Sequence, residues 1–149
     1  IGIEGASDDH LRASMQVLLN RFRYLFEVAE QTSYRLFKHP YAPLTNGTYT
    51  TPRYAEYLFR MYELITDDRL GPIWNEVNGL DVQPEPYLAW GTHLCGLTLG
   101  NNPSGYSWVT GVGSRPVMRP LHVPSLVDDI EAPVPGITVY GPCAANGCA

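Results

Sequence analysis

Residues whose types could carry out acid–base or nucleophilic chemistry include two adjacent carboxylates and two serines in the last third of this chain of 149 residues. Asp128 and Asp129 are adjacent carboxylates, but their spacing and context favour a solvated loop or a helix cap over a catalytic pair. Ser107 and Ser125 lack a Gly-x-Ser-x-Gly turn, and no His or Asp partner can be assigned to them. Neither serine is therefore predicted to be a nucleophile.

Metal and thiol chemistry have no stronger support. His10, His39, His93 and His122 show no paired ligand spacing. Cys95 falls in an apolar helical pattern, which is typical of a packed thiol. We therefore predict no catalytic residue, no metal and no cofactor within this chain.

The most informative stretch runs from Leu99 to Gly113 and continues from Arg119 to Ser125. The residues that define its pattern are small, β-branched, basic or proline residues, namely Ser107, Val109, Thr110, Gly111, Gly113, Arg115, Pro120 and Ser125. With these residues the stretch resembles the C-terminal active-site segment of glycoside hydrolase family 9, the inverting cellulases built on an (α/α)6 barrel. The resemblance implies a helical domain that acts on β-1,4-glucans.

Further segments extend the resemblance along the chain. Residues 129–142 contain Ala-Pro-Val-Pro-Gly and resemble a later run of the same family. Ser33 to Leu36 and Tyr54 to Thr66 follow the order of the family more loosely. We therefore predict that residues 1–149 are a single unit, the C-terminal part of a family 9-like domain.

Two positions depart from the family pattern. Leu121 stands where the family has His, and Val123 stands where it has Arg. In the family these residues hydrogen-bond sugar hydroxyls, and neither Leu nor Val has a side chain that can do so. His122 lies between them and could substitute only after a one-residue loop shift, which Pro120 and Pro124 restrict.

The resemblance also implies two carboxyl groups that this chain is not expected to supply. An inverting glycosidase needs a base and an acid about 6.5–9.5 Å apart. In the family the base lies in an Asp-x-x-Asp motif, and the acid is a Glu beyond the Pro-Val-Pro-Gly run. The chain contains no Asp-Ala-Gly-Asp, and Ala149 falls about where the segment with the Glu should begin.

Hydrophobic periodicity predicts an all-α fold, a partial (α/α)6 barrel with a long irregular C-terminal segment. We expect helices over 8–32, 51–67, 72–77 and from 84–86 to 100, with a loop over 39–50. After Pro103 we expect irregular backbone and a short strand pair. Ser7 is a good helix cap, and Gly100 with Asn101 is a typical helix stop.

The buried faces follow from the same periodicity. In the first helix we expect Leu11, Met15, Leu18, Phe22, Leu25 or Phe26, and Ala29 to be buried. In the second we expect Ala55, Leu58, Phe59, Tyr62 and Ile65, with Tyr54 and Tyr57 facing outward. In the third long helix we expect Leu88, Gly91, Leu94, Cys95 and Leu99.

Aromatic side chains are the remaining candidates for binding, because sugar rings stack on them and hydrogen-bond their polar rims. We predict that Tyr106, Trp108, Arg119 and His122 contact substrate. Trp74, Trp90 and Tyr140 are weaker candidates, for which burial or an interface between copies is an alternative use.

Charge and short motifs limit the partners and the compartment. A net charge of -5 without a basic cluster argues against nucleic acid, and apolar runs are too short for a membrane helix. Asn46-Gly47-Thr48 is a glycosylation sequon, and Cys143 and Cys148 are close enough to form a disulfide. The first residues do not resemble a signal peptide. We expect an extracellular, secreted protein that appears here as a mature or internal segment.

Three hypotheses for function follow. The first is a catalytically degenerate family 9 scaffold that acts as an extracellular structural or carbohydrate-contacting subunit. The second is the C-terminal part of an active endo-β-1,4-glucanase whose catalytic Asp and Glu lie outside this chain. The third is a lectin-like glycan-binding module. Expected partners are a β-glucan or another glycan, and either the remainder of a longer polypeptide or other copies of the chain.

Overall fold

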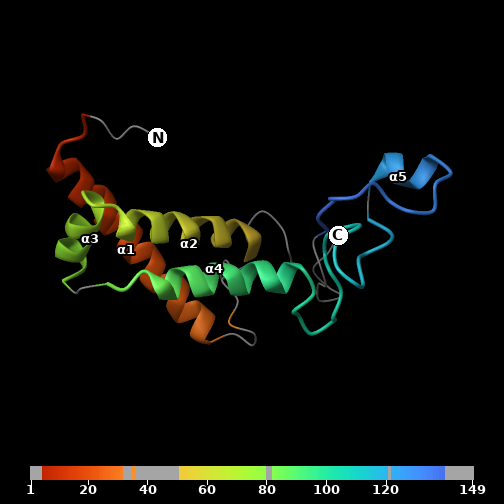
Figure 1. Ribbon diagram of the computed structural model, residues 1–149, viewed down its shortest axis with the longest axis horizontal. Coiled ribbons are helices and arrows are strands. Elements are labelled where there is room, and N and C mark those ends of the chain that lie inside the picture. The colour runs from red at the N-terminus through yellow and green to blue at the C-terminus, as the bar shows by residue number, and fades with distance from the viewer. Residues whose placement is uncertain (1–4, 32–34, 36–50, 80–81, 121, 140–149) are drawn as a thin grey trace.

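The computed structural model of the protein describes residues 5–31, 35, 51–79, 82–120 and 122–139. Within these ranges it contains five helices, α1 (Asp8–Glu30), α2 (Thr51–Thr66), α3 (Leu70–Asn78), α4 (Glu85–Thr98) and α5 (Val123–Val127). Figure 1 shows α2 and α4 side by side and antiparallel, with α1 crossing them and α5 at the opposite end from α3. The all-α class is confirmed, and the long C-terminal segment is irregular as expected.

The sequence signals at the helix ends are close to correct. α1 begins after Ser7, whose Oγ accepts a hydrogen bond from the His10 N–H at 3.4 Å. It ends at Glu30, two residues before the predicted end. α4 ends at Thr98 rather than Gly100, because Gly100 adopts φ +118° and the Asn101 N–H returns to the Gly96 carbonyl at 2.8 Å.

α3 begins two residues before its predicted start because a side chain caps it. Asp67 Oδ1 accepts hydrogen bonds from the N–H groups of Arg69 (2.9 Å) and Leu70 (2.8 Å). These two bonds favour the carboxylate form and hold the pKa of Asp67 below its ordinary value of 3.8. Gly79 ends the helix in a left-handed conformation, φ +71°.

α2 and α4 approach closely at a glycine. A Cβ added to Gly91 would lie 2.6 Å from Phe59 Cε1, so a larger residue there would force the ring to move. Rings bridge α1 to α4, with centroids 6.0 Å apart for Phe22 and Tyr87 and 5.7 Å apart for Phe26 and Trp90. Burial raises the pKa of the Cys95 thiol on α4, which keeps the thiol protonated.

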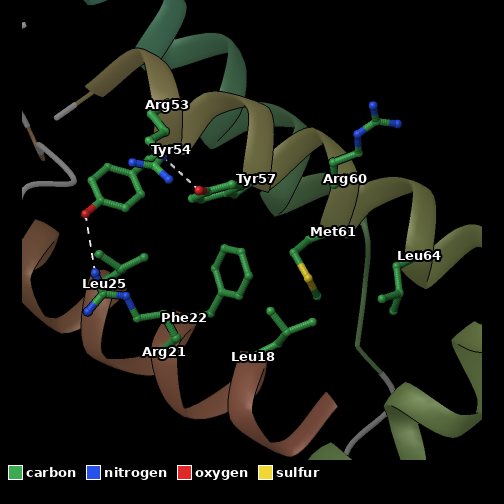
Figure 2. A pocket seen from close by; sticks show the side chains of 10 residues that line it. All are labelled: Leu18, Arg21, Phe22, Leu25, Arg53, Tyr54, Tyr57, Arg60, Met61 and Leu64. Atoms are coloured by element: carbon green, nitrogen blue, oxygen red, sulfur yellow. Dashed lines mark hydrogen bonds between the residues drawn. The ribbon is translucent and has the colours of Figure 1, made fainter. Parts of the chain in front are cut away.

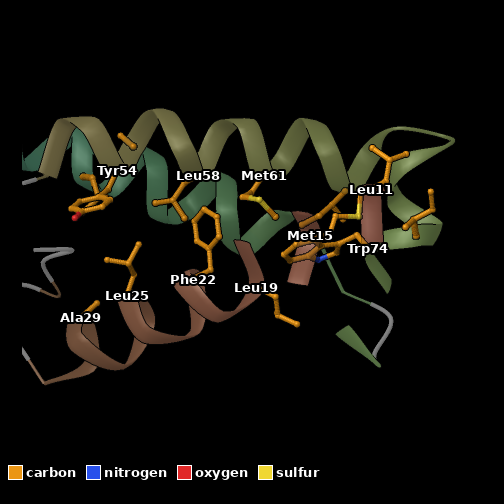
Figure 3. Packing of buried hydrophobic residues seen from close by; sticks show 14 of the residues in the cluster. Leu11, Met15, Leu19, Phe22, Leu25, Ala29, Tyr54, Leu58, Met61 and Trp74 are labelled. Atoms are coloured by element: carbon orange, nitrogen blue, oxygen red, sulfur yellow. The ribbon is translucent and has the colours of Figure 1, made fainter. Parts of the chain in front are cut away.

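The apolar core lies between α1, α2, α3 and α4, as Figure 3 shows. Most of the predicted face of α1 is buried, but Leu18 is 39% exposed and Leu19, at 4%, takes its place. On α2, Tyr54 is only 5% exposed, so its predicted outward orientation is wrong. Met61 is buried as well and was not predicted.

Tyr54 is buried because α1 passes beside it, and its hydroxyl accepts a hydrogen bond from Arg21 on that helix. On α4, Gly91 and Leu94 are buried and Cys95 is half-buried. Leu88 and Leu99 are 42% and 48% exposed, contrary to prediction, and Leu99 lies one residue beyond the end of α4.

The expected strand pair after Pro103 is replaced by two isolated bridges. Ser107 pairs with Pro116 in parallel, and Val109 pairs with Thr138 in antiparallel fashion. Among the residues the structure describes, no helix is long and apolar enough to cross a membrane. Asn46, Tyr140, Cys143 and Cys148 lie outside these residues, so the predictions made for them stay predictions.

Candidate functional site

Residues 99–139, which we call the C-terminal segment, are anchored to α4 by a buried amide. Asn102 is 9% exposed, and its Nδ2 donates to the carbonyls of Leu97 (2.7 Å) and Tyr106 (2.9 Å). Its Oδ1 accepts from the N–H of Ser104 at 3.0 Å and from its hydroxyl at 2.6 Å. One side chain therefore fixes the turn that precedes Tyr106.

A buried hydroxyl ties the two halves of this segment together. Thr110 is fully buried, its Oγ1 donates to the carbonyl of Val134, and the same oxygen accepts from the Ile137 N–H at 2.9 Å. The Thr110 carbonyl also accepts from the Gly136 N–H at 2.8 Å. The Thr-Gly motif and the Pro-Val-Pro-Gly run, which are distant in sequence, are thus neighbours in space.

Gly111 is required where these two runs meet. It adopts φ +69°, and an added Cβ would lie 2.9 Å from Pro135 Cβ. A side chain would meet both backbone strain and a rigid ring. This accounts for glycine at that point of the family pattern.

The two predicted aromatic contacts differ in exposure. Tyr106 is 43% exposed, and the guanidinium carbon of Arg115 lies 4.2 Å from its ring centroid. Trp108 is 7% exposed, its N–H donates to the Thr98 carbonyl at the end of α4, and its carbonyl accepts from the Val139 N–H within the segment. The burial of Trp108 favours a packing role, while Tyr106 offers an accessible ring.

His122 caps α5. Its Nδ1 lies 2.9 Å from Ser125 Oγ and accepts from the Ser125 N–H at 3.4 Å. Ser125 Oγ in turn accepts from the Val134 N–H at 3.1 Å. The imidazole nitrogen that faces α5 is therefore engaged in local structure.

The four predicted contact residues do not form one cluster. Within the described ranges, no hydrogen bond, ion pair or ring contact joins His122 or Arg119 to Tyr106 or Trp108. Arg119 is exposed, and Val123 is 66% exposed. Leu121 lies outside the described residues.

The acidic pair lies at a turn on the surface. Asp128 Oδ1 accepts from the Ile130 N–H at 3.1 Å, and Asp129 adopts φ +57°. Both side chains are exposed. In the ranges that the structure describes, no group of three or more His, Cys, Asp or Glu residues could hold a metal ion.

Sequence reasoning missed a groove between α1 and α2, which Figure 2 shows. It has a volume of about 450 Å³ and is lined by five apolar residues, three arginines and two tyrosines: Leu18, Phe22, Leu25, Met61, Leu64, Arg21, Arg53, Arg60, Tyr54 and Tyr57. Arg53 Nε donates to Tyr57 Oη at 2.8 Å, and Arg21 Nη2 donates to Tyr54 Oη at 3.4 Å. The residues that line it therefore combine an apolar floor with cationic and phenolic groups.

The signal that could have located this groove is present in the sequence. Leu18, Leu19 and Phe22 are all apolar, so the apolar face of α1 is wider than one neighbouring helix covers. Leu18 lies at the uncovered edge. Arg21 lines the groove beside it.

The model of glycosyl hydrolase family 9 matches residues 14–148, so the chain belongs to that family. Its helical structure, without strands in the described ranges, is consistent with a fragment of an (α/α)6 barrel.

One curated relative adds detail. The xyloglucan-specific endo-beta-1,4-glucanase BoGH9A of Bacteroides ovatus is 48% identical to this chain over 44 residues. The aligned stretch covers 30% of this chain and 8% of that protein's length. No solved structure matches the chain.

Proposed function

We propose that this chain is the C-terminal part of a family 9 domain that contacts a β-glucan or another glycan and no longer hydrolyses it. The observation that carries the proposal is the side chain at position 123. Val123 is apolar and 66% exposed, and it stands where the family pattern has Arg. Leu121 is likewise an apolar residue at a position where the pattern has His. These side chains cannot donate hydrogen bonds to a sugar.

The surroundings of these two positions support the proposal. Thr110 and Gly111 hold the backbone of the loop as described above. Nδ1 of the His122 ring contacts the Ser125 hydroxyl, so this nitrogen is part of the cap of α5. The scaffold is thus kept while the polar groups at 121 and 123 are absent. Tyr106 and Arg115 supply an exposed aromatic and cationic surface that suits a sugar.

Hydrolysis and binding should be measured separately on the protein that carries this chain. We expect it to bind xyloglucan, mixed-linkage glucan or carboxymethylcellulose in affinity electrophoresis while releasing no reducing sugar above the blank. Leu121→His/Val123→Arg tests whether those two positions alone block the reaction. Release of reducing sugar by this variant would show that the residues at positions 121 and 123 block hydrolysis in the unmodified protein.

Val17→Arg is a matched control, because Val17 is 70% exposed on α1 and the change adds the same charge far from the segment. It should leave binding and hydrolysis unchanged. Substantial turnover by the unmodified protein would overturn the proposal of lost catalysis.

The second candidate is the C-terminal part of an active endo-β-1,4-glucanase. It is favoured by the intact frame around Thr110 and by the 44-residue match to a xyloglucan-specific glucanase. In that case the unmodified protein would release xyloglucan oligosaccharides, and the catalytic Asp and Glu would lie on other polypeptide.

The expected partners and compartment complete the proposal. The groove between α1 and α2 exposes apolar surface, which supports packing against the remainder of a longer polypeptide or against other copies. The intact mass of the purified protein together with light scattering would distinguish these two. Extracellular location rests on the Asn46 sequon and the Cys143 and Cys148 pair, so a mass loss on deglycosylation would support it.

A further inference from the structure

The backbone of the C-terminal segment holds Tyr106 and Arg115 next to each other. The Ser107 N–H donates to the Arg115 carbonyl at 2.9 Å, and the Val117 N–H donates to the Ser107 carbonyl at 3.1 Å. Arg115 therefore pairs with the residue that follows Tyr106. The guanidinium also lies beside Gly105, because a Cβ added to that residue would be in ordinary van der Waals contact with Arg115 Nη1, at 3.6 Å.

We call this pair the Tyr106–Arg115 stack, and it is the tightest such pair in the described part of the chain. Its separation from ring centroid to guanidinium carbon is 4.2 Å, against 5.7 Å for both Arg21 over Tyr24 and Arg53 over Tyr57. At this distance the cation is attracted to the face of the ring, which favours this placement of the guanidinium.

The hydrogen-bonding capacity of the stack is unused. The Arg115 guanidinium makes no hydrogen bond or ion pair with any residue that the structure describes, and it is exposed. By contrast, Arg53 donates to the hydroxyl of its own tyrosine, Tyr57. The five N–H donors of Arg115 are open to a ligand.

A planar guanidinium that is already held in place binds a carboxylate through two parallel hydrogen bonds. The adjacent ring packs against the C–H face of a sugar. We propose that the Tyr106–Arg115 stack is a subsite for a carboxylate-bearing unit of an acidic glycan. This inference rests on the proposed function, because it requires that the chain binds a glycan.

The test uses two polymers with the same β-1,4-glucan backbone, anionic carboxymethylcellulose and neutral hydroxyethylcellulose. We expect the protein to bind the anionic polymer about three- to tenfold more tightly at low salt, as for an exposed ion pair joined to a stacking contact. The preference should shrink as salt is raised. Arg115→Gln should reduce the affinity for carboxymethylcellulose to that for hydroxyethylcellulose and leave the latter unchanged.

Two further variants sharpen the test. Arg115→Lys keeps the charge but loses the planar pair of donors, so it should restore only part of the preference. Arg23→Gln is the matched control, because Arg23 is exposed on α1 outside the lining of the groove and its loss changes net charge equally. It should leave the preference intact, and both Gln variants should unfold at the same midpoint as the unmodified protein.

The outcomes separate the two proposals. Equal affinity for both polymers, unchanged by Arg115→Gln, would overturn the acidic subsite and leave glycan binding standing. An equal loss of preference in Arg23→Gln would assign the preference to net charge and overturn the subsite too. Binding to neither polymer would overturn the proposed function together with the inference.

Discussion

The helical region, α1 to α4, and the C-terminal segment are held together by different forces. Every residue of the buried apolar cluster comes from α1 to α4. The buried residues of the C-terminal segment include Asn102, Ser107 and Thr110, whose side chains all make hydrogen bonds. Apolar burial is non-directional, whereas hydrogen bonds fix orientation. The chain thus places its candidate binding residues where directional bonds, not bulk burial, set the backbone.

In the apolar region, the largest change in the free energy of unfolding is expected for substitutions of Trp74. Its side chain is fully buried, and its Nε1 has no hydrogen-bond partner among the described residues. We expect Trp74→Ala to lower the free energy of unfolding by about 3–5 kcal/mol, because the lost contacts leave a cavity. Trp74→Phe should cost less, since it retains a ring and removes the unpaired N–H. Denaturant unfolding followed by circular dichroism measures both.

Val17→Ala is the control for Trp74. Val17 is 70% exposed on α1, so its truncation should change stability by less than about 0.5 kcal/mol. If Trp74→Ala were as mild as this control, the view that apolar burial holds the helices would be wrong.

Thr110 tests the C-terminal segment. Thr110→Val removes one donor and one acceptor and leaves the Ile137 N–H without its partner, which should cost about 2 kcal/mol locally. We expect the amides of Gly136 and Ile137 to exchange with deuterium about thirtyfold faster. Thr110→Ser keeps the hydroxyl and should show a much smaller change.

The helical region should be unaffected by Thr110→Val in the same exchange experiment. If the amides of α2 and α4 accelerated equally, the two regions would unfold as one unit and the contrast between them would not hold.

Asp67 gives the smallest expected effect, and the size of this effect depends on pH. Its pKa is lowered in the folded state by the N–H groups of Leu70 and Arg69, so its carboxylate stabilises α3 above pH 3.8. This contribution should fade as the pH falls below that value. The thermal midpoint of Asp67→Asn should therefore lie below that of the unmodified protein at pH 7 and approach it near pH 3.

Asp68→Asn is the neighbouring control, because Asp68 is exposed and makes no hydrogen bond with a described residue. Its midpoint should follow that of the unmodified protein at every pH. A gap between Asp67→Asn and the unmodified protein that did not narrow in acid would contradict the capping role of the charge.

The helices could be predicted from the sequence because their signals are local. Ser7, Gly79 and Gly100 mark helix ends within two residues of those observed. The errors at Leu18 and Tyr54 arise because periodicity gives an apolar face but not how far the neighbouring helix covers it. Tyr54 is buried because α1 crosses α2 beside it, and this crossing is not encoded in the periodicity of α2.

The candidate site was predictable only in part. Spacing identified Tyr106 and Thr110 as members of a family pattern. It could not reveal that Thr110 bonds Val134 and Ile137, because such pairing depends on folding of a long loop. It also passed over Arg115 as a ligand contact, since an arginine in a loop shows no partner until the backbone brings Tyr106 beneath it.

The bonds from Thr110 to Val134, Gly136 and Ile137 close residues 111–133 into a loop whose ends are tied at one point. Closing such a loop costs entropy that grows only slowly with its length, so residues can be exchanged or added inside it at little expense to the tie. Both departures from the family pattern, Leu121 and Val123, lie within this loop. The polar or apolar character of positions 121 and 123 can therefore change while the bonds that tie the two ends of the loop persist.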